Sequence, residues 1–188
     1  MTRAWQGSAV VAVAAVAIAC VPPVPDVQTA TYAIYSVILD SLFANRDSPL
    51  PLYHETRPAP IESYESLGVA RIGAVDPRVS SALWTRFVTT NERRVALCAR
   101  CLRTRVPVAM VATMPSVLRS PAPEDPERRN ERLRLVSVSS IAFSDDRRLA
   151  LVHAYGDCGY LCGWGGLYLV VFERGRWSIR LCLISEAA

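Results

Sequence analysis

The residues with the clearest chemical potential are thiols in the second half of the chain. The sequence holds six cysteines and only two histidines. Cys158 and Cys162 form a C-x3-C pair inside the glycine-rich segment 156–166, and Cys98 and Cys101 form a C-x-x-C pair. Thiols at these spacings close local disulfides, bind a metal or carry out redox chemistry, and the compartment decides among the three.

The N-terminus predicts export. It carries Arg3 and then the unbroken apolar run Ala9–Ala19, which has the pattern of a signal peptide and is shorter than the roughly 20 apolar residues of a membrane-spanning helix. We therefore assign residues 1–19 to a signal. Ala17–Cys20 resembles a bacterial lipobox, with Ala in place of the usual Leu, so Cys20 is the predicted lipidation site. An ordinary secretory cleavage and an uncleaved anchor are the alternatives.

Export changes how the cysteines are interpreted. In an oxidising compartment we expect a disulfide between Cys158 and Cys162, and a possible second one between Cys98 and Cys101. A zinc site built from all four thiolates is an alternative. Redox activity of the C-x-x-C pair is disfavoured, because the pair closes a predicted helix rather than opening one.

The glycine-rich segment is also the predicted binding loop. Its candidate contact residues are Asp157, Tyr160 and Trp164, together with His153 on the strand that leads into it. An alternative is a hydrolase or thiol enzyme that uses His153 with a loop cysteine. No hydrolase, metalloprotease or phosphate-loop motif occurs, and we predict no catalytic residue, metal or cofactor.

Regular elements must position these residues. Residues 29–43 have helical periodicity, with Asp26 as the cap, and Asp76-Pro77 is typical of a helix start. A further helix is predicted from Thr89 to Cys101. Residues 51–56 have strand character, and residues 106–112 are an apolar run of strand length for which a helix is the alternative. In the first of these, neighbouring His54 and Glu55 would point to opposite faces.

The last third has the alternation of a four-stranded meander. The strands are predicted over residues 133–143, 149–155, 167–173 and 177–184, with a bulge at Ser139-Ser140, where the alternation slips. The predicted fold is α+β, with N-terminal helices packed on a C-terminal antiparallel sheet. It occupies a single domain over residues 29–188, joined to the anchor by a proline-rich tether at 20–28.

Composition limits the function further. The chain has 188 residues, enough for one domain, and 51% of them are apolar, as expected of a folded core. The formal charge is +4, and the basic residues, all arginine, are scattered along the chain. Nucleic-acid binding is disfavoured because it uses a concentrated basic face.

Two separated blocks carry a resemblance. One is the helix with Tyr32, Tyr35 and Leu39 in the pattern Y-x-x-Y-x-x-x-L. The other is a C-terminal pattern that contains S-x-x-F, A-L-V, C-G-x-L-C-G-x-G and G-x-W, here Ser140–Phe143, Ala150–Val152, Cys158–Gly165 and Gly175–Trp177. Together they resemble a group of uncharacterised bacterial secreted proteins and lipoproteins. The resemblance implies this fold and an exported location, and it leaves activity and any protein or small-molecule partner open.

Overall fold

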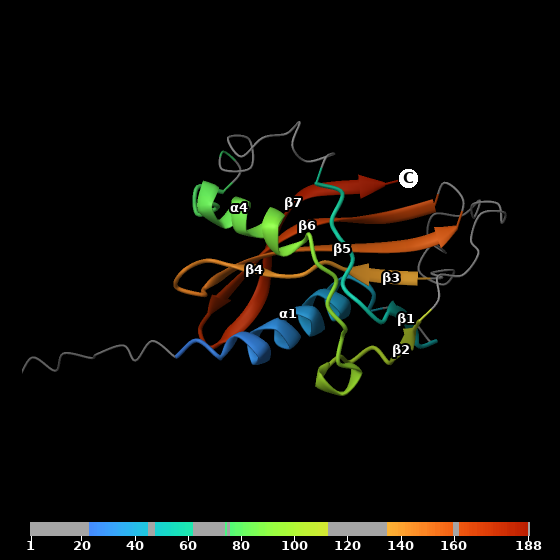
Figure 1. Ribbon diagram of the computed structural model, residues 1–188. Helices are drawn as coiled ribbons and strands as arrows, with labels where there is room; N and C mark the ends of the chain where they lie inside the picture. Colours follow the sequence, from blue (N-terminus) through green and yellow to red (C-terminus); the bar gives the residue numbers. More distant parts are fainter. Residues whose placement is uncertain are drawn as a thin grey trace, which may run out of the picture.

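The computed structural model describes residues 23–44, 48–61, 74, 76–112, 135–159 and 162–187. The predicted signal, Cys20 and Tyr160 lie outside these residues. The fold is α+β, as predicted. Helix α1 covers one face of a seven-stranded sheet and helix α4 covers part of the other (Figure 1).

The sheet is mixed. Its order is β2-β1-β3-β5-β6-β7, and β4 pairs with β5 as well. β1 runs parallel to both β2 and β3, whereas the pairings from β3 to β7 are antiparallel. The strands are β1 (Leu50–Tyr53), β2 (Val108–Val111), β3 (Leu135–Val138), β4 (Ala142–Phe143), β5 (Leu149–Gly159), β6 (Cys162–Glu173) and β7 (Arg176–Ala187).

The prediction of about four antiparallel strands is correct for the C-terminal block and incomplete for the sheet. Segments 51–56 and 106–112 were predicted as strands without a place in it, and they form β1 and β2 at its edge. The chain passes through α4 between them, so it enters both strands in the same direction and they pair in parallel. Local alternation cannot reveal such a pairing, because the partners are far apart in sequence.

The predicted bulge at Ser139-Ser140 is confirmed. Val138 pairs with Ala154, and Ala142 pairs with Leu151. Between these two pairs the chain from β3 to β4 advances by four residues, whereas β5 advances by three. The extra residue separates β3 from β4 and reverses which residues face α1.

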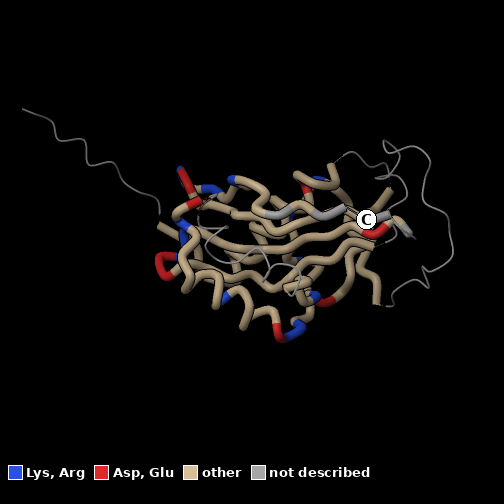
Figure 2. Tube along the Cα trace, turned by 90° about the horizontal axis from the view of Figure 1, so that it is seen from above, with Lys and Arg blue, Asp and Glu red and all other residues tan. Residues whose placement is uncertain are grey.

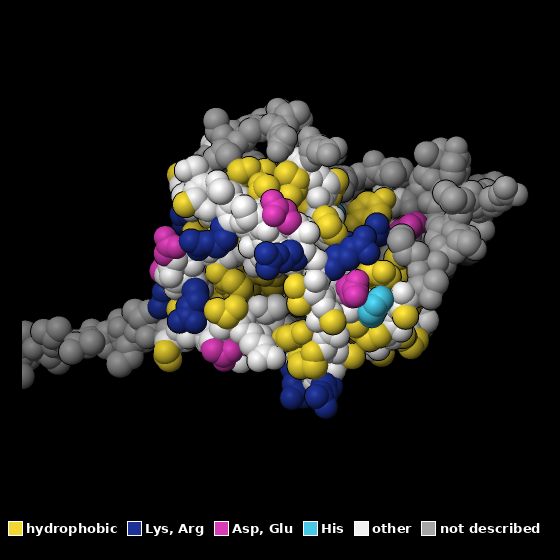
Figure 3. Space-filling view, viewed as in Figure 1, with side chains coloured by type: hydrophobic (Ala, Val, Ile, Leu, Met, Phe, Trp, Pro, Cys, Tyr) yellow, Lys and Arg dark blue, Asp and Glu magenta, His cyan; other side chains and the backbone are white. Residues whose placement is uncertain are grey.

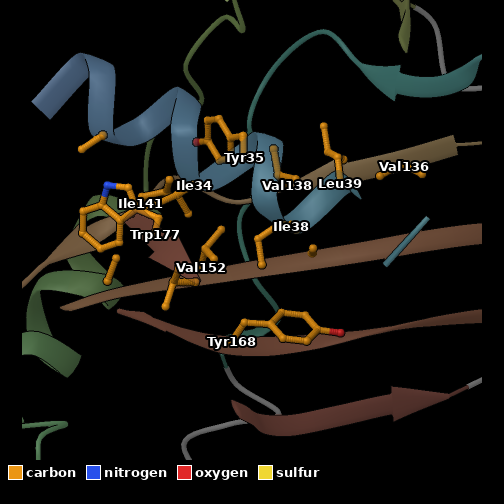
Figure 4. Packing of buried hydrophobic residues seen from close by; sticks show 14 of the residues in the cluster. Ile34, Tyr35, Ile38, Leu39, Val136, Val138, Ile141, Val152, Tyr168 and Trp177 are labelled. Carbon is orange, nitrogen blue, oxygen red and sulfur yellow. The ribbon is translucent and has the colours of Figure 1, made fainter. Parts of the chain in front are cut away.

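α1 (Val27–Leu42) starts within the predicted tether, and its predicted cap is confirmed. The Asp26 carboxylate accepts a hydrogen bond from the Thr29 backbone N–H at 3.0 Å. The helix buries Ile34, Ile38 and Leu39 against the sheet, where Figure 4 shows them directed at side chains of the central strands. Among the described residues, this interface belongs to the larger of two hydrophobic clusters.

α4 (Ser81–Thr90) starts later than predicted. Ser80 caps it by accepting the Leu83 N–H at 3.2 Å. The predicted cap, Asp76, is instead bound to Arg78, whose guanidinium and backbone N–H both donate to its carboxylate. This charge-assisted arrangement stabilises a turn ahead of the helix.

The predicted helix from Thr89 to Cys101 is wrong. Thr89 remains inside α4, where its hydroxyl donates to the carbonyl four residues earlier, at Thr85. After Asn91 the chain is extended, and only the short 3-10 helix η1 (Ala99–Cys101) interrupts it. The residues of the apparent capping box therefore end one helix and do not begin another, because the residues that follow form their hydrogen bonds with other elements.

Candidate functional site

The predicted binding loop is the end of a long β-hairpin. β5 continues to Gly159 and β6 begins at Cys162, so most of segment 156–166 is strand. Gly156 pairs with Trp164 and Asp157 pairs with Gly163. Glycines that the sequence presented as loop formers are therefore part of a hydrogen-bonded ladder. A binding role for this hairpin stays a prediction.

The candidate contact residues do not converge on one surface. His153 and Asp157 lie at alternate positions of β5 and face the α4 side of the sheet, His153 buried and Asp157 half-buried. Trp164 faces the α1 side, where its ring stacks on Phe43 with centroids 4.6 Å apart. Alternation along paired strands sends these side chains to opposite faces. Tyr160 lies outside the described residues.

Of the alternative of a His153–cysteine catalytic pair, the structure bears only on Cys158, which lies away from His153. Strands rise about 3.3 Å per residue, so His153 and Cys158 are roughly 16 Å apart along β5. The His153 ring is buried and lies almost parallel to that of Tyr155, with centroids 6.5 Å apart. Its surroundings are those of a residue packed within the sheet.

The possible second disulfide is present. Cys98 and Cys101 are bonded, with a sequence separation of 3. Cys158 is also disulfide-bonded, but the side chain of Cys162 lies outside the described residues, so their pairing stays a prediction. In this oxidised form Cys98, Cys101 and Cys158 are not thiolates, whereas the zinc alternative requires thiolate ligands. No group of three or more potential metal ligands occurs within the described ranges.

The prediction that His54 and Glu55 point to opposite faces is wrong. β1 ends at Tyr53, and the chain bends at His54, which brings its Nε2 within 3.6 Å of a Glu55 carboxylate oxygen. Both side chains are about one-third exposed, at 38% and 33%. A solvated pair of this kind contributes little to stability.

The bulge is the centre of a buried polar network. The Ser139 hydroxyl accepts the His153 backbone N–H and donates to the Ser140 carbonyl, both at 2.8 Å. Tyr35 on α1 donates to the Ser139 carbonyl at 2.9 Å, and the Ser140 hydroxyl donates to Thr56 at 3.1 Å. Burial raises the pKa of Tyr35, so its phenol remains a neutral donor. The bulge at Ser139-Ser140 is thus connected by hydrogen bonds to α1, to β5 and to the segment after β1.

Asn91 extends this network and leaves one atom without a partner. It ends α4 and is 1% exposed. Its Nδ2 donates to the carbonyls of Phe87 at 2.8 Å and Ser140 at 3.3 Å. Its Oδ1 is buried and has no hydrogen-bond partner among the described residues. Most buried polar atoms in proteins are hydrogen-bonded, so this acceptor calls for an explanation.

Residues 92–106, which we call the strap, connect α4 to β2 and run along α1. Tyr32, Ser36 and Asp40 are spaced four residues apart on α1, and all of them accept hydrogen bonds from strap backbone N–H groups. The donors are Cys98, Arg103, Arg105 and Val106, at distances of 2.7–3.2 Å. The side chains of one helix thus replace a neighbouring strand in satisfying an extended segment.

A hollow of about 530 Å³ lies between α1, the end of α4 and the strap. Figure 3 views this side of the molecule and shows mostly apolar and uncharged polar surface between the elements, with basic side chains around it. The lining residues are Thr31, Tyr32, Tyr35, Thr56, Thr89, Thr90, Glu92, Arg93, Val95, Ala96, Leu97, Ser140 and Ile141. Hydroxyl groups therefore dominate its polar lining.

Another hollow, of about 610 Å³, lies beside the start of α4. Two of its three lining arginines are engaged by acids: Arg78 binds Asp76 and approaches Glu173, and Arg86 donates to Asp145 at 2.7 Å. Charges of both signs lie at the ends of the elements and on turns, as Figure 2 shows. With these guanidinium groups already paired, this hollow offers less to a ligand than the one beside the strap.

No family model, curated protein or solved structure matches this chain. Among the described residues, no helix is long and apolar enough to cross a membrane. The candidate site therefore depends on the geometry alone. Sequence reasoning named Tyr32 and Tyr35 only as part of a helix pattern and Ser140 only as part of a bulge, and it missed Thr56 and the strap as parts of a site.

Proposed function

We propose that this protein is an exported, lipid-anchored bacterial envelope protein that acts by binding a ligand. Its binding site is the hollow bounded by α1, the end of α4 and the strap. The observation that carries the proposal is the hollow itself, whose lining combines the hydroxyl-bearing side chains of Tyr32, Thr56 and Ser140 with apolar side chains. A few polar groups in a mostly apolar concave lining are typical of a ligand site.

The lining favours binding over catalysis. Within the described residues, it includes no histidine and no cysteine, and its ionisable side chains other than tyrosine are Glu92 and Arg93, both exposed. Its volume lies within the range of about 300–1,000 Å³ that is typical of small-molecule sites. The hairpin at 156–166 is a weaker candidate because Trp164 and His153 are engaged in packing.

Export is supported by the signal-like N-terminus and by the cysteines. The Cys98–Cys101 disulfide suits an oxidising compartment. We expect the native chain to fractionate with membranes and Cys20→Ser to be released, because one residue carries the acyl chains. Unchanged membrane association of Cys20→Ser would overturn the lipid anchor and leave the binding site to be tested separately.

Binding is tested by NMR titration of ¹⁵N-labelled protein with small probes of four classes: neutral saccharides, short peptides, nucleotides and soluble phospholipids. We expect one class to shift backbone amides of residues 31–35 and 89–97. Thr90→Trp places a large ring in the hollow and should abolish the shifts. Gln28→Trp, on an exposed turn of α1, is the matched control. Shifts confined to residues 156–166 would move the site to the hairpin, and no shifts with any class would overturn the binding function.

A further inference from the structure

The net positive charge of this protein is concentrated in the strap. Arginines occur throughout the sequence, but residues 92–106 hold five of them and a single glutamate, a formal charge of +4. This equals the formal charge of the whole chain, so the remaining residues carry no net charge. The strap arginines are all exposed: Arg93, Arg94, Arg100, Arg103 and Arg105.

Most of these arginines have no acid beside them. Within the described parts of the chain, Arg105 is the one that forms an ion pair, with the Asp40 carboxylate at 3.4 Å, and its side chain is still 82% exposed. By contrast, Arg78 and Arg86 near the start of α4 are held by acids at 2.8 Å and 2.7 Å. The guanidinium groups of the strap are therefore the ones available to an anionic partner.

The backbone of the strap is held in place, so its arginines form a fixed surface. Side chains of α1 accept hydrogen bonds from four strap N–H groups, and the Cys98–Cys101 disulfide closes the η1 bend that carries Arg100. Figure 3 shows basic side chains on this side of the molecule and at the η1 bend. The charge is spread along an extended segment and does not converge on one cavity, which suits a broad array of anions.

Val95 adds an apolar group to this surface. Its side chain is 55% exposed, although its backbone is fixed by two hydrogen bonds with Thr56, at 2.8 Å and 2.9 Å. It directly follows Arg93 and Arg94 in the sequence. A bilayer offers negative headgroups with apolar chains beneath them, so it fits a valine beside arginines. A soluble anion offers nothing apolar for the valine to contact.

The strap also lies close to the predicted anchor. Cys20 is six residues before Asp26, so it lies within about 20 Å of the start of α1. Tyr32, which accepts the Cys98 N–H of the strap, is only about 8 Å along the helix from Val27. Val27 itself is 51% exposed at this end of α1. A bilayer that holds residue 20 is therefore within reach of the strap.

We propose that the strap docks on an anionic lipid bilayer, with its arginines against the headgroup phosphates and Val95 within the headgroup layer. This inference rests on the proposed lipid anchor and adds an orientation to it. Acyl chains on one residue limit the distance between the domain and the membrane but leave the domain free to rotate. A second contact through the strap fixes which side of α1 faces the lipid.

The test is sedimentation with lipid vesicles. The protein is the chain that follows the predicted signal, residues 20–188 with Cys20→Ser, which keeps every described helix and strand and carries no acyl chain. The vesicles are phosphatidylcholine alone or an equal mixture with phosphatidylglycerol. We expect binding to the mixture only, and we expect it to weaken as the Debye length falls from about 10 Å at 0.1 M salt to about 3 Å at 1 M.

Two double variants remove charge from the strap. Arg93→Gln with Arg94→Gln, and Arg100→Gln with Arg103→Gln, should each lower the affinity for the mixed vesicles about 25-fold, because one basic residue near an anionic surface contributes about fivefold. Circular dichroism of each variant verifies its fold.

Two further variants separate the strap from net charge and from charge alone. Arg174→Gln with Arg180→Gln is the matched control, since both residues are exposed and lie outside the strap, and it should change the affinity less than about twofold. Val95→Ser keeps the charge and should lower the affinity about fivefold, the value for burying the exposed half of a valine side chain.

The outcomes distinguish this inference from the lipid anchor, because the tested chain has no acyl group. Absence of binding to the mixed vesicles, or equal losses in the strap and control variants, would overturn docking through the strap. Tighter binding to soluble polyphosphate than to vesicles, with no effect of Val95→Ser, would assign the strap to a soluble polyanion and refute the membrane surface. The anchor is tested separately by washing fractionated membranes of Cys20→Ser with about 1 M salt, which releases protein held by the strap alone.

Discussion

Gly163 and Tyr155 make a diagonal contact between neighbouring strands, and their energetic coupling can be measured. The phenol of Tyr155 on β5 lies over Gly163 on β6, in the space that a Cβ atom at position 163 would occupy. The φ angles of Gly163 and of the nearby Gly165 are not positive. Close approach, and not backbone conformation, therefore explains the glycine at position 163.

The perturbation is Gly163→Ala. Overpacking of this kind costs about 1–3 kcal/mol. Replacing glycine by alanine also removes freedom from the unfolded chain, which returns about 0.4–1 kcal/mol. The new methyl would overlap the ring of Tyr155, so we expect the upper part of that range and a net loss of about 2 kcal/mol in the free energy of unfolding.

A double-mutant cycle isolates the cause. In a Tyr155→Ala background the space is empty, so Gly163→Ala should be neutral or slightly stabilising, giving a coupling energy of about 2–3 kcal/mol. The assay is urea denaturation of the four proteins, followed by circular dichroism. A coupling energy below about 0.5 kcal/mol would refute the reasoning, because it would mean that Tyr155 does not exclude a side chain at Gly163.

Gly165 provides the matched control. A Cβ atom there would meet backbone atoms of β5, the Ala154 carbonyl oxygen and the Tyr155 Cα. Truncation of a side chain cannot remove these atoms. Gly165→Ala should therefore destabilise the protein equally with Tyr155 or alanine at position 155, and rescue by Tyr155→Ala would contradict the structure.

Three further predictions concern the disulfide, the buried network and an ion pair. Replacing Cys98 and Cys101 by serine should lower the free energy of unfolding by about 2 kcal/mol in urea, the loop-closure value for a separation of 3, and an unchanged value would show no net stabilisation. Tyr35→Phe, which removes a donor 2.9 Å from a buried carbonyl of the bulge, should cost about 1–2 kcal/mol in the same assay, and a neutral result would contradict the hydrogen bond. The hydrogen bond from Arg78 lowers the pKa of Asp76 below its ordinary value, so this pair stabilises the fold fully above about pH 4 and less as pH falls through the lowered pKa; Asp76→Asn should flatten the acid side of the stability–pH curve, and an unaltered curve would exclude the linkage.

Much of the fold follows from local pattern. The cap at Asp26, the helix after it and the alternation of the last third were predictable because side chains of one face recur at a fixed spacing in helices and strands. The bulge at Ser139-Ser140 was predictable for the same reason, since a slip in alternation requires an extra residue. The C-x-x-C disulfide at Cys98 followed from spacing and the expected compartment.

The misassigned segments share a physical cause. The strap has helix-like signals near Thr89 but is extended, because its N–H groups are satisfied by side chains of α1 such as Ser36 and Asp40. Segment 156–166 has loop-like glycines but is strand, because β5 and β6 pair almost to the end of the hairpin. In both cases a distant partner outweighs local preference.

The sequence by itself determined the helix that begins at Asp26, the C-terminal meander with its bulge, the signal-like start and the cysteine pairs, since all of these depend on residues near one another in the chain. Only the tertiary structure decided that β1 and β2 join the sheet in parallel and that the glycines at 163 and 165 accommodate close contacts. It also placed Tyr32, Thr56 and Ser140 around one hollow. These features depend on which distant segments meet, and that choice is made by the packing of the whole chain.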